Sequence, residues 1–385
     1  MTSKCPRCFR TLTQDLFAWE CTGTCQPLPD AEASANAGTQ VLSRPLVKMQ
    51  RPHDNRRWIA PASVPCPKCG RSGREVCPYC HYALLPHWRA TQTVCVALAG
   101  ARATGKTIYL AILIKELEEM FSYNHLSLGF ADPKSRSIYE EIYERPLYEA
   151  RGIPRATNPA ADQDAYQRDP IILNMGVLRN GPAMLVIRDV AGEDLENPPP
   201  DERYLGYFER ADTVLFLFDP SAVNDVRDLL TDYLPKEAHQ PGDPERVLEV
   251  LLRIMGVSLV PIGMVVSKFD TMQALAWVED QQWSQIMANA GAAFARDPGI
   301  NAWSYDPVDG DLLHEEVRSL LNKLNAQRFV NTLASANQRS AREYRFFAVS
   351  ALGDHVIGDK LHPRGIAPFR CLDPIRWVLA RRGIA

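Results

Sequence analysis

The sequence lacks the long apolar segments that mark exported or membrane-spanning chains. Its longest apolar run, Ile254 to Val266, is too short to cross a bilayer and is interrupted by Gly256, Pro261 and Gly263. No apolar stretch occurs from Met1 to Arg10, so we expect no secretory signal peptide. We therefore expect a cytoplasmic protein with no membrane partner, in a compartment where disulfides are rare.

An excess of charge of one sign is also missing. The 43 Lys and Arg residues are balanced by 46 Asp and Glu residues, which leaves a net charge of −3. Overall charge therefore does not predict a polyanion-binding protein. We find no Ser-His-Asp arrangement typical of nucleophilic hydrolases. The length of 385 residues allows two or three domains.

Cysteine, by contrast, is abundant and ordered. Eight of the ten cysteines form four short knuckles. Because four thiolates in a closed tetrahedral shell are typical of structural Zn²⁺, we predict two zinc sites, each built from two successive knuckles. The first site comprises Cys5, Cys8, Cys21 and Cys25, and the second comprises Cys66, Cys69, Cys77 and Cys80. This interpretation gives a zinc ribbon at residues 1–30, a linker at 31–61 and a second ribbon at 62–90, although a different pairing of the knuckles stays open.

Two other uses of these cysteines fit less well. Disulfides or free thiols conflict with the expected compartment. The run from Cys77 to His81 matches the attachment pattern of haem c, but that chemistry needs export. Small zinc modules usually dock protein or nucleic acid, and basic residues surround these knuckles. A solvated ribbon face explains those residues as well, so nucleic acid is possible but we favour a protein partner.

A phosphate-binding pattern follows the cysteines. The apolar run Val94 to Ala99 is typical of a buried strand, and Ile108 to Met120 has the periodicity of an amphipathic helix. Between them, Gly100 to Thr107 reads GARATGKT and matches G-x-x-x-x-G-K-[ST] completely. A strand before the loop and a helix after it are the context that this pattern needs.

Each residue type in this loop has a chemical reason. The glycines allow the backbone to approach a phosphate, and the N–H groups of the loop and of the helix N-terminus hold the anion. We expect Lys106 to reach the β and γ phosphates and the Thr107 hydroxyl to bind Mg²⁺. The expected nucleotide-binding residues here are Gly100, Ala103, Thr104, Gly105, Lys106 and Thr107.

A D-x-x-G loop follows the apolar strand Ala183 to Arg188. We expect Asp189 to hold Mg²⁺ through water. The N–H of Gly192 would meet the γ-phosphate, so that the loop senses this group. Taken alone the pattern is weak, because Asp and Gly are common in turns.

Two further loops are typical of guanine recognition. The strand Ile262 to Val266 ends in S-K-F-D, in which Ser267 stands where the N-K-x-D pattern has Asn. Asp270 can accept hydrogen bonds from guanine N1–H and N2–H₂, a donor pair that adenine lacks, while the stem of Lys268 can pack on the base. The strand Phe346 to Val349 ends in a loop that would support the base from its other side. That loop comprises Ser350, Ala351 and Leu352.

The order of these four loops resembles the TRAFAC class of P-loop GTPases, over about Thr91 to Ala385. Within that class the chain is most similar to bacterial double-GTPase domains predicted to work in conflict or defence systems, through Ile153 to Thr157 and Asp373 to Trp377. The resemblance implies GTP or GDP and Mg²⁺ as ligands, a protein partner or a second GTPase, and a GTPase domain at residues 91–385. It does not cover the zinc region.

The expected fold class is α/β, with a mixed, mainly parallel sheet between helices and small zinc-ribbon modules at the N-terminus. Each of the four loops follows an expected apolar strand, and nucleotide would lie at the C-terminal ends of these strands. The strand Ile171 to Val177 would be antiparallel, because the turn at residues 179–181 makes a hairpin with the next strand plausible.

Several departures from the small-GTPase pattern affect the expected mechanism. Glu193 occupies the place where many such enzymes have a water-orienting Gln, so we expect slow intrinsic hydrolysis. Arg102, inside the phosphate loop, could place a positive charge over the γ-phosphate or point outward. Thr157 is the candidate switch I threonine, although it could be an ordinary loop residue. The candidate catalytic residues are therefore Arg102, Lys106, Thr157, Gly192 and Glu193.

The leading interpretation is a regulatory GTPase switch whose zinc ribbons dock a partner. Two alternatives stay open. One is an ATPase or kinase, since the phosphate loop alone does not select the base. The other is a nucleotide-bound scaffold without turnover that recruits protein or nucleic acid.

Overall fold

The computed structural model describes residues 2–55, 57–154, 169–198, 201–229, 242–353 and 361–384. Its centre is a seven-stranded sheet in the order β12-β11-β10-β6-β9-β8-β7. The strands are β6 (Gln92–Ala99), β7 (Gly129–Phe130), β8 (Ile171–Leu178), β9 (Gly181–Arg188), β10 (Thr213–Phe218), β11 (Ile262–Val266) and β12 (Tyr344–Ala348). The runs of apolar residues in β6, β10 and β11 are buried along their whole length, as expected for parallel strands covered on both faces.

The sheet is mixed in the way the sequence predicts. Strands β12, β11, β10, β6 and β9 are parallel to one another, whereas β8 pairs antiparallel with β9. The two-residue turn between β8 and β9 forms the expected hairpin. A short strand, β7, extends the antiparallel edge. The predicted fold class is therefore confirmed.

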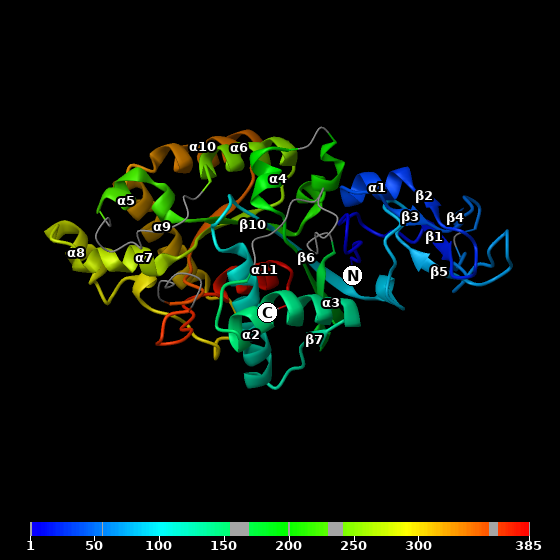
Figure 1. Ribbon diagram of the computed structural model, residues 1–385, viewed down its shortest axis with the longest axis horizontal. Helices are drawn as coiled ribbons and strands as arrows, with labels where there is room; N and C mark the ends of the chain where they lie inside the picture. The colour runs from blue at the N-terminus through cyan, green and yellow to red at the C-terminus, as the bar shows by residue number, and fades with distance from the viewer. Residues whose placement is uncertain are drawn as a thin grey trace.

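Helices cover both faces of the sheet. In Figure 1, α4, α6 and α10 lie on one side of the sheet, and α2, α3 and α11 lie on the other. Aspartates cap several of these helices just before a proline, as in Asp243 of α6 and Asp306 of α9. The α-helices of this region are α2 (Lys106–Tyr123), α3 (Pro133–Ile138), α4 (Gly192–Glu196), α5 (Asn224–Leu229), α6 (Pro244–Met255), α7 (Phe269–Gln273), α8 (Gln281–Met287), α9 (Pro307–Lys323), α10 (Gln327–Ser340) and α11 (Asp373–Arg381).

Short 3₁₀ segments and one π-helix complete the connections. The π-helix, η2 (Tyr139–Glu149), contains Pro146 and packs against α2 and α3. The 3₁₀ segments are η1 (Trp88–Ala90), η4 (Glu202–Leu205), η5 (Phe208–Arg210), η6 (Pro220–Ala222), η7 (Ala274–Trp277) and η8 (Ala293–Ala295).

The N-terminal region forms a small antiparallel sheet at one end of the molecule, on the right in Figure 1. Its strands are β1 (Leu16–Cys21), β4 (Leu46–Gln50) and β5 (Gly73–Val76), with β1 in the centre. A ribbon of β2 (Leu28–Pro29) and β3 (Leu42–Ser43) flanks α1 (Ala31–Ala37). The segment interpreted as a linker thus contributes α1 and β4. The domain boundaries given above stay a prediction.

Candidate functional site

The loop between β6 and α2 has the backbone shape that its glycines predict. Gly100 has φ +143°, and a Cβ added there would lie 2.4 Å from the carbonyl oxygen of Leu217. Gly105, which precedes α2, has φ +85°, and Ala103 has φ +60°. The loop therefore folds tightly over the end of the sheet and opens at the N-terminus of α2, where anions bind.

Lys106 points into the centre of this loop. Its ammonium group is buried and donates hydrogen bonds to the carbonyl oxygens of Gly100, at 2.8 Å, and Ala101, at 2.9 Å. Burial lowers the pKa of Lys106, while the carboxylates of Asp189 and Glu196 act in the opposite direction. The cation is thus enclosed by the loop that the sequence assigns to phosphate binding.

Asp189 lies beside the phosphate loop because β9 and β6 are paired in parallel. In the register of these strands Arg188 stands opposite Ala97, so Asp189 follows at the level of Leu98, two residues before the loop begins. The Asp189 carboxylate is buried and accepts a hydrogen bond from the amide of Val190 at 2.9 Å. A carboxylate here and the Thr107 hydroxyl at the start of α2 are oxygen ligands of the type that Mg²⁺ prefers. The donor set fits Mg²⁺, and the assignment stays a prediction.

The helix α4 packs directly on the phosphate loop. A Cβ added at Gly192 would lie 2.5 Å from the amide nitrogen of Arg102, so only glycine fits this contact. The carboxylate of Glu196 accepts the Arg102 amide at 3.0 Å and the Arg102 Nε at 2.9 Å. Glu193 lies 3.5 Å from the same guanidinium and is partly exposed. Arg102 therefore pairs with carboxylates of α4.

The sequence did not predict Glu196 as a residue of the site. It lies three residues beyond Glu193, and a carboxylate at the end of a short acidic helix gives no signal of a contact with the phosphate loop. The catalytic roles of Arg102, Gly192 and Glu193 stay predictions, and Thr157 lies outside the described residues.

The S-K-x-D loop is tied to the phosphate loop by its serine. The Ser267 hydroxyl is buried, 2.8 Å from the carbonyl oxygen of Thr104 and 3.0 Å from that of Phe218. Lys268 has φ +49° and forms an ion pair with Asp219 at 2.6 Å. Ser267 thus joins two loops of the site through a side-chain hydroxyl although it replaces an Asn.

Asp270 and Ser350 meet at the other end of this region. The Ser350 hydroxyl lies 2.5 Å from Oδ1 of Asp270 and accepts the amide of Gly353 at 3.0 Å. Burial raises the pKa of Asp270, and the hydrogen bond from Ser350 opposes this effect. Ala351 and Leu352 follow as half-buried residues. The structure therefore brings the two loops predicted to read the base together.

The cysteines form two compact clusters, but the predicted pairing is wrong. The inner cluster comprises Cys5, Cys8, Cys77 and Cys80, and the outer cluster comprises Cys21, Cys25, Cys66 and Cys69. The first knuckle thus joins the fourth, and the second joins the third. The reason is the antiparallel pairing of β1 with β5, which places Cys21 opposite Gly73 and carries the chain after Val76 back toward the N-terminus.

Both clusters fit Zn²⁺. The four sulfur atoms of each lie within 4.8 Å of one another. The closest pairs are 3.5 and 3.7 Å apart in the inner cluster and 3.5 and 3.8 Å in the outer one. A tetrahedral shell with Zn–S bonds of about 2.3 Å has S···S edges of about 3.8 Å. Burial raises the pKa of the Cys5 and Cys77 thiols, so a bound cation would be needed to keep these two groups as thiolates.

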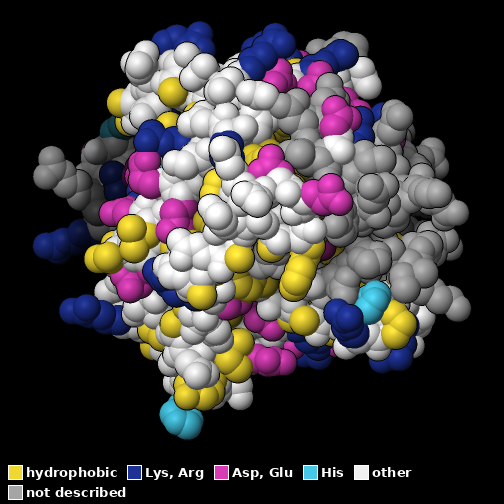
Figure 2. Space-filling model, turned by 90° about the vertical axis from the view of Figure 1, so that its left-hand side faces the viewer, with side chains coloured by type: hydrophobic (Ala, Val, Ile, Leu, Met, Phe, Trp, Pro, Cys, Tyr) yellow, Lys and Arg dark blue, Asp and Glu magenta, His cyan; other side chains and the backbone are white. Residues whose placement is uncertain are grey.

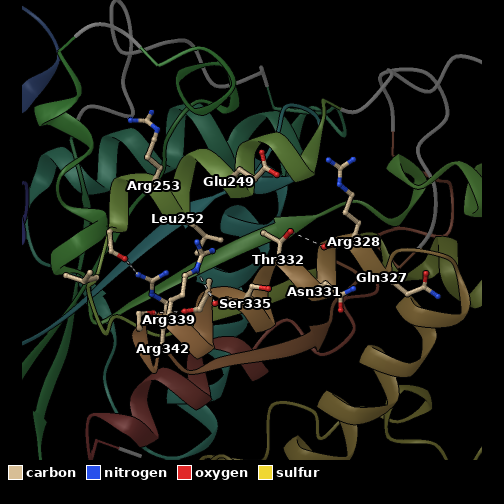
Figure 3. A pocket seen from close by; sticks show the side chains of 14 residues that line it. Glu249, Leu252, Arg253, Gln327, Arg328, Asn331, Thr332, Ser335, Arg339 and Arg342 are labelled. Atoms are coloured by element: carbon tan, nitrogen blue, oxygen red, sulfur yellow. Dashed lines mark hydrogen bonds between the residues drawn. The ribbon is translucent and has the colours of Figure 1, made fainter.

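A separate basic hollow lies between α6 and α10, away from these loops. It has a volume of about 860 Å³ and is lined by side chains of both helices, with Arg253 and Glu249 on α6 and Arg328 and Arg339 on α10 (Figure 3). Arg328 pairs with Glu245, so part of this charge is already neutralised. No residue of the four nucleotide loops lines the hollow.

The face of the molecule shown in Figure 2 carries charges of both signs. Among its described residues, Lys and Arg are interspersed with Asp, Glu and apolar side chains. This mixture differs from the single-sign surface of a typical nucleic-acid-binding face. No helix in the described part of the chain has both the length and the apolar character needed to cross a membrane.

Comparison with known proteins identifies the family. The model of the family "Double-GTPase 2" matches residues 94–324. The chain is 38% identical to "Putative ESX-1 scaffolding and assembly protein SaeC" of Mycolicibacterium smegmatis, over 99% of this chain and all of that protein.

Likeness to solved structures is distant. The bacterial selenocysteine-specific elongation factor EF-Sec overlaps 68% of this chain at 13% identity and a TM-score of 0.25. The GTP-bound GTPase-like domain of Saccharomyces cerevisiae Ski7 overlaps 77% at 11% identity and a TM-score of 0.31. This chain spans only 26% and 51% of those two chains. On the family match and the SaeC alignment, the chain belongs to the Double-GTPase 2 family.

Proposed function

We propose that this protein is a guanine-nucleotide-binding switch that controls the assembly of a protein complex. The observation that carries the proposal is the hydroxyl of Ser267, which links the base-reading loop to the Thr104 carbonyl in the phosphate loop. A phosphate site and a guanine-selective carboxylate are thereby held as one unit. Membership of a GTPase family supports the same assignment.

Recognition of guanine would depend on Asp270. Its carboxylate is held by Ser350, and the helix α7 that begins at Phe269 fixes its backbone. An ionised carboxylate in this position accepts from N1–H and N2–H₂ of guanine, whereas adenine leaves it unpaired. A buried, unpaired acceptor costs about 1–3 kcal/mol, and more when it is charged, which is the source of the selectivity.

The response to the γ-phosphate would lie in α4. Gly192 and the carboxylates of Glu196 and Glu193 stand beside the loop that would bind phosphate. A bound γ-phosphate adds negative charge next to these carboxylates, so GTP and GDP favour different positions of α4. Mg²⁺, held by Thr107 and Asp189, would neutralise phosphate charge. Because Glu193 replaces the water-orienting Gln, hydrolysis would be slow without a partner.

The partner would be a protein. SaeC is named as a putative scaffolding and assembly protein, and it aligns with this chain along its whole length. This favours an assembly role, in which a partner or a second GTPase reads the nucleotide state. A role in conflict or defence systems stays a prediction from resemblance, and cytoplasmic location stays a prediction from the absence of long apolar segments in the sequence.

Competitive binding of GTP and ATP to zinc-loaded protein with Mg²⁺ tests the proposal. We expect GTP to bind at least about a hundredfold more tightly, and Asp270→Asn to lose most of that preference. Asp306→Asn makes the same chemical change at the cap of α9, outside the four nucleotide loops, and Asn also caps helices, so this control should retain the preference. Preference for ATP that Asp270→Asn does not alter would support an ATPase or kinase instead.

Single-turnover hydrolysis separates the switch from a passive scaffold. We expect cleavage of bound GTP by the protein alone at no more than about 10⁻³ s⁻¹, in the range of small GTPases without an activating protein. Rapid cleavage would contradict the role given to Glu193. Tight GTP binding with no cleavage, even with a partner present, would favour the non-hydrolysing scaffold.

A further inference from the structure

The inner cysteine cluster is part of the GTPase unit. Lys4, next to the first knuckle, forms an ion pair with Asp212 at 2.7 Å, and its backbone N–H donates to the Thr93 hydroxyl at 2.8 Å. Phe9, just after that knuckle, packs edge-on against Tyr207 with ring centroids 5.4 Å apart. The knuckle therefore rests on strands and loops of the nucleotide-binding domain.

Arg7, inside the knuckle between Cys5 and Cys8, touches two strand ends. Its guanidinium Nη2 donates to Oδ1 of Asp169 at 2.8 Å, and both side chains are largely buried. Its carbonyl oxygen accepts a hydrogen bond from the guanidinium of Arg188. Asp169 stands two residues before β8, and Arg188 is the last residue of β9. One residue of the metal knuckle thus connects both strands of the hairpin that leads into Asp189.

Arg188 makes this contact important, because it is a buried cation for which no residue of the described part of the chain supplies a paired carboxylate. Its guanidinium lies over the ring of Tyr207, 3.8 Å from the centroid, and donates to Arg7. Burial lowers the pKa of Arg188, which shows that the site disfavours its charge. The Arg7 carbonyl and the Tyr207 ring therefore hold the guanidinium of the last residue of β9, in addition to the pairing of this strand with β6 and β8.

The same region contacts the chain after α4. The helix α1 packs against η4, which follows the D-x-x-G loop in the sequence, and the two lie side by side in Figure 1. Asp30, the cap of α1, is bonded at 2.6 Å to His81, the residue that follows the inner knuckle Cys77–Cys80. The inner cluster therefore connects to this part of the nucleotide domain in two ways. One is the contact of Arg7 with Arg188 at the end of β9, and the other runs from His81 through Asp30 and α1 to η4.

We propose that Arg7 is a positioning residue through which metal binding at the inner cluster fixes Asp189 and the D-x-x-G loop for nucleotide. This rests on the proposed function, since it names a residue that regulates the same site. Metal would fix the backbone of the knuckle and thereby the position of Arg7. Arg7 in turn contacts Asp169, just before β8, and Arg188, at the end of β9. The outer cluster is bonded differently: among the described residues its cysteines form hydrogen bonds within the N-terminal region, for example with Gly23, Arg44 and Lys68.

The test compares Arg7→Ala, Arg7→Lys, Asp169→Asn and the double variant Arg7→Ala with Asp169→Asn. Arg10→Ala is the matched control, because Arg10 lies in the same loop but stacks on Tyr79. The readouts are zinc content, the release rate of a fluorescent guanine nucleotide, and hydrogen exchange of residues 181–190. We expect Arg7→Ala and Asp169→Asn each to speed release about fivefold, with no further increase in the double variant.

Several results would contradict the proposal. If nucleotide release and hydrogen exchange in Arg7→Ala equal those in Arg10→Ala, Arg7 has no positioning role. If the effects of the two single variants multiply in the double variant, Arg7 and Asp169 act separately. We expect Arg7→Lys, which keeps the cation, to restore most of the wild-type rate. Where Arg7→Ala also loses zinc, the comparison of Asp169→Asn with Lys134→Ala decides, because Asp169 lies outside both clusters and also pairs with Lys134.

The positioning role of Arg7 can be tested even if the proposed nucleotide-binding function is wrong. If the wild-type protein binds neither GTP nor GDP, the function is wrong, and hydrogen exchange alone is the readout. Faster exchange of residues 181–190 in Arg7→Ala and in Asp169→Asn, with no addition in the double variant, would still support positioning by Arg7. Unchanged exchange would overturn it.

Discussion

The two clusters each contain four cysteines, but their surroundings are very different. All four inner cysteines are buried, and the cluster belongs to the same apolar core as the central sheet. In the outer cluster Cys69 is exposed and Cys25 is only partly buried. The comparison teaches that an identical ligand set can serve as an internal brace in one place and as an exposed module in another.

This difference follows from where each cluster lies in the fold. The inner knuckles contact Thr93 and Asp212 beside β6 and β10, so loss of metal there would disturb the nucleotide domain. The outer knuckles lie where Cys21 ends β1 and Gly73 begins β5, at the far end of the N-terminal sheet. The outer cluster is accordingly the better candidate for docking a partner.

Loss of one ligand in each cluster should give the largest contrast. Cys80→Ser removes an inner ligand, and because the metal contributes folding energy to the shared core, we expect a destabilisation of about 4 kcal/mol or more. Cys69→Ser changes the last cysteine of the matching outer knuckle. This variant should lose one zinc ion, with little change in the free energy of unfolding of the nucleotide domain. Denaturant unfolding with zinc analysis checks this, and equal destabilisation by both variants would erase the distinction.

Removal of an arginine near each cluster, buried at the inner one and exposed at the outer one, should give the next contrast. Arg188→Met leaves the Arg7 carbonyl unpaired and the Tyr207 ring without its cation, so we expect a loss of about 3 kcal/mol. Arg74→Ala breaks the ion pair with Glu20 near the outer cluster, where the Arg74 side chain is 55% exposed, and should cost no more than about 1 kcal/mol. The midpoints of denaturant unfolding would reveal the difference, and a reversed order would count against the inner cluster as a brace.

Substitution of Gly192 tests whether α4 is packed as tightly as the inner knuckle. An added Cβ would lie 2.5 Å from the Arg102 amide, so Gly192→Ala should force α4 off the phosphate loop at a cost of about 2 kcal/mol. Gly129→Ala, where nothing lies within 4 Å of the added atom, is the control. Thermal unfolding of both variants checks this, and equal midpoints would mean that α4 does not rest on the loop.

The smallest effect concerns pH and lies on α2. Burial, together with the nearby Glu119 and Asp297 carboxylates, raises the pKa of Glu116 from its ordinary 4.5 to about 7. Because the folded protein binds this proton more tightly, the stabilisation by the protonated form is complete below pH 4.5 and is lost as the pH rises through 7. Glu116→Gln should therefore match the wild type at low pH and be more stable at pH 8, by about 1 kcal/mol after allowance for solvent screening.

The measurement for Glu116 is unfolding at a series of pH values, with the exposed residue Glu149 changed to Gln as control. Glu149→Gln should show no gain that grows with pH. A gain for Glu116→Gln at low pH rather than at high pH would reverse the sign expected from the raised pKa.

Local patterns predicted the strands and the loops well, because each depends on a short run of sequence. The loop at residues 100–107, the hairpin between β8 and β9, and the meeting of Asp270 with Ser350 follow from apolar periodicity and from parallel pairing of the strands. The substitution of Ser267 for Asn left its role uncertain, and only the structure shows its hydroxyl beside Thr104.

Long-range contacts escaped prediction because spacing along the chain carries no information about them. Successive knuckles were paired by proximity in sequence, whereas the pairing of β1 with β5 brings the first knuckle to the fourth. In the same way, Glu196 reaches Arg102 and Arg7 reaches Asp169 across the fold. Neither pair belongs to a motif.

The most direct test of a guanine-nucleotide switch braced by the inner cluster is stepwise removal of metal by a chelator. Zinc release and loss of a bound fluorescent guanine nucleotide would be followed in the same sample. We predict that the first equivalent of zinc, from the outer cluster, leaves without loss of nucleotide. The second equivalent, from the inner cluster, should leave together with the nucleotide. Release of both equivalents with the nucleotide still bound would contradict the account.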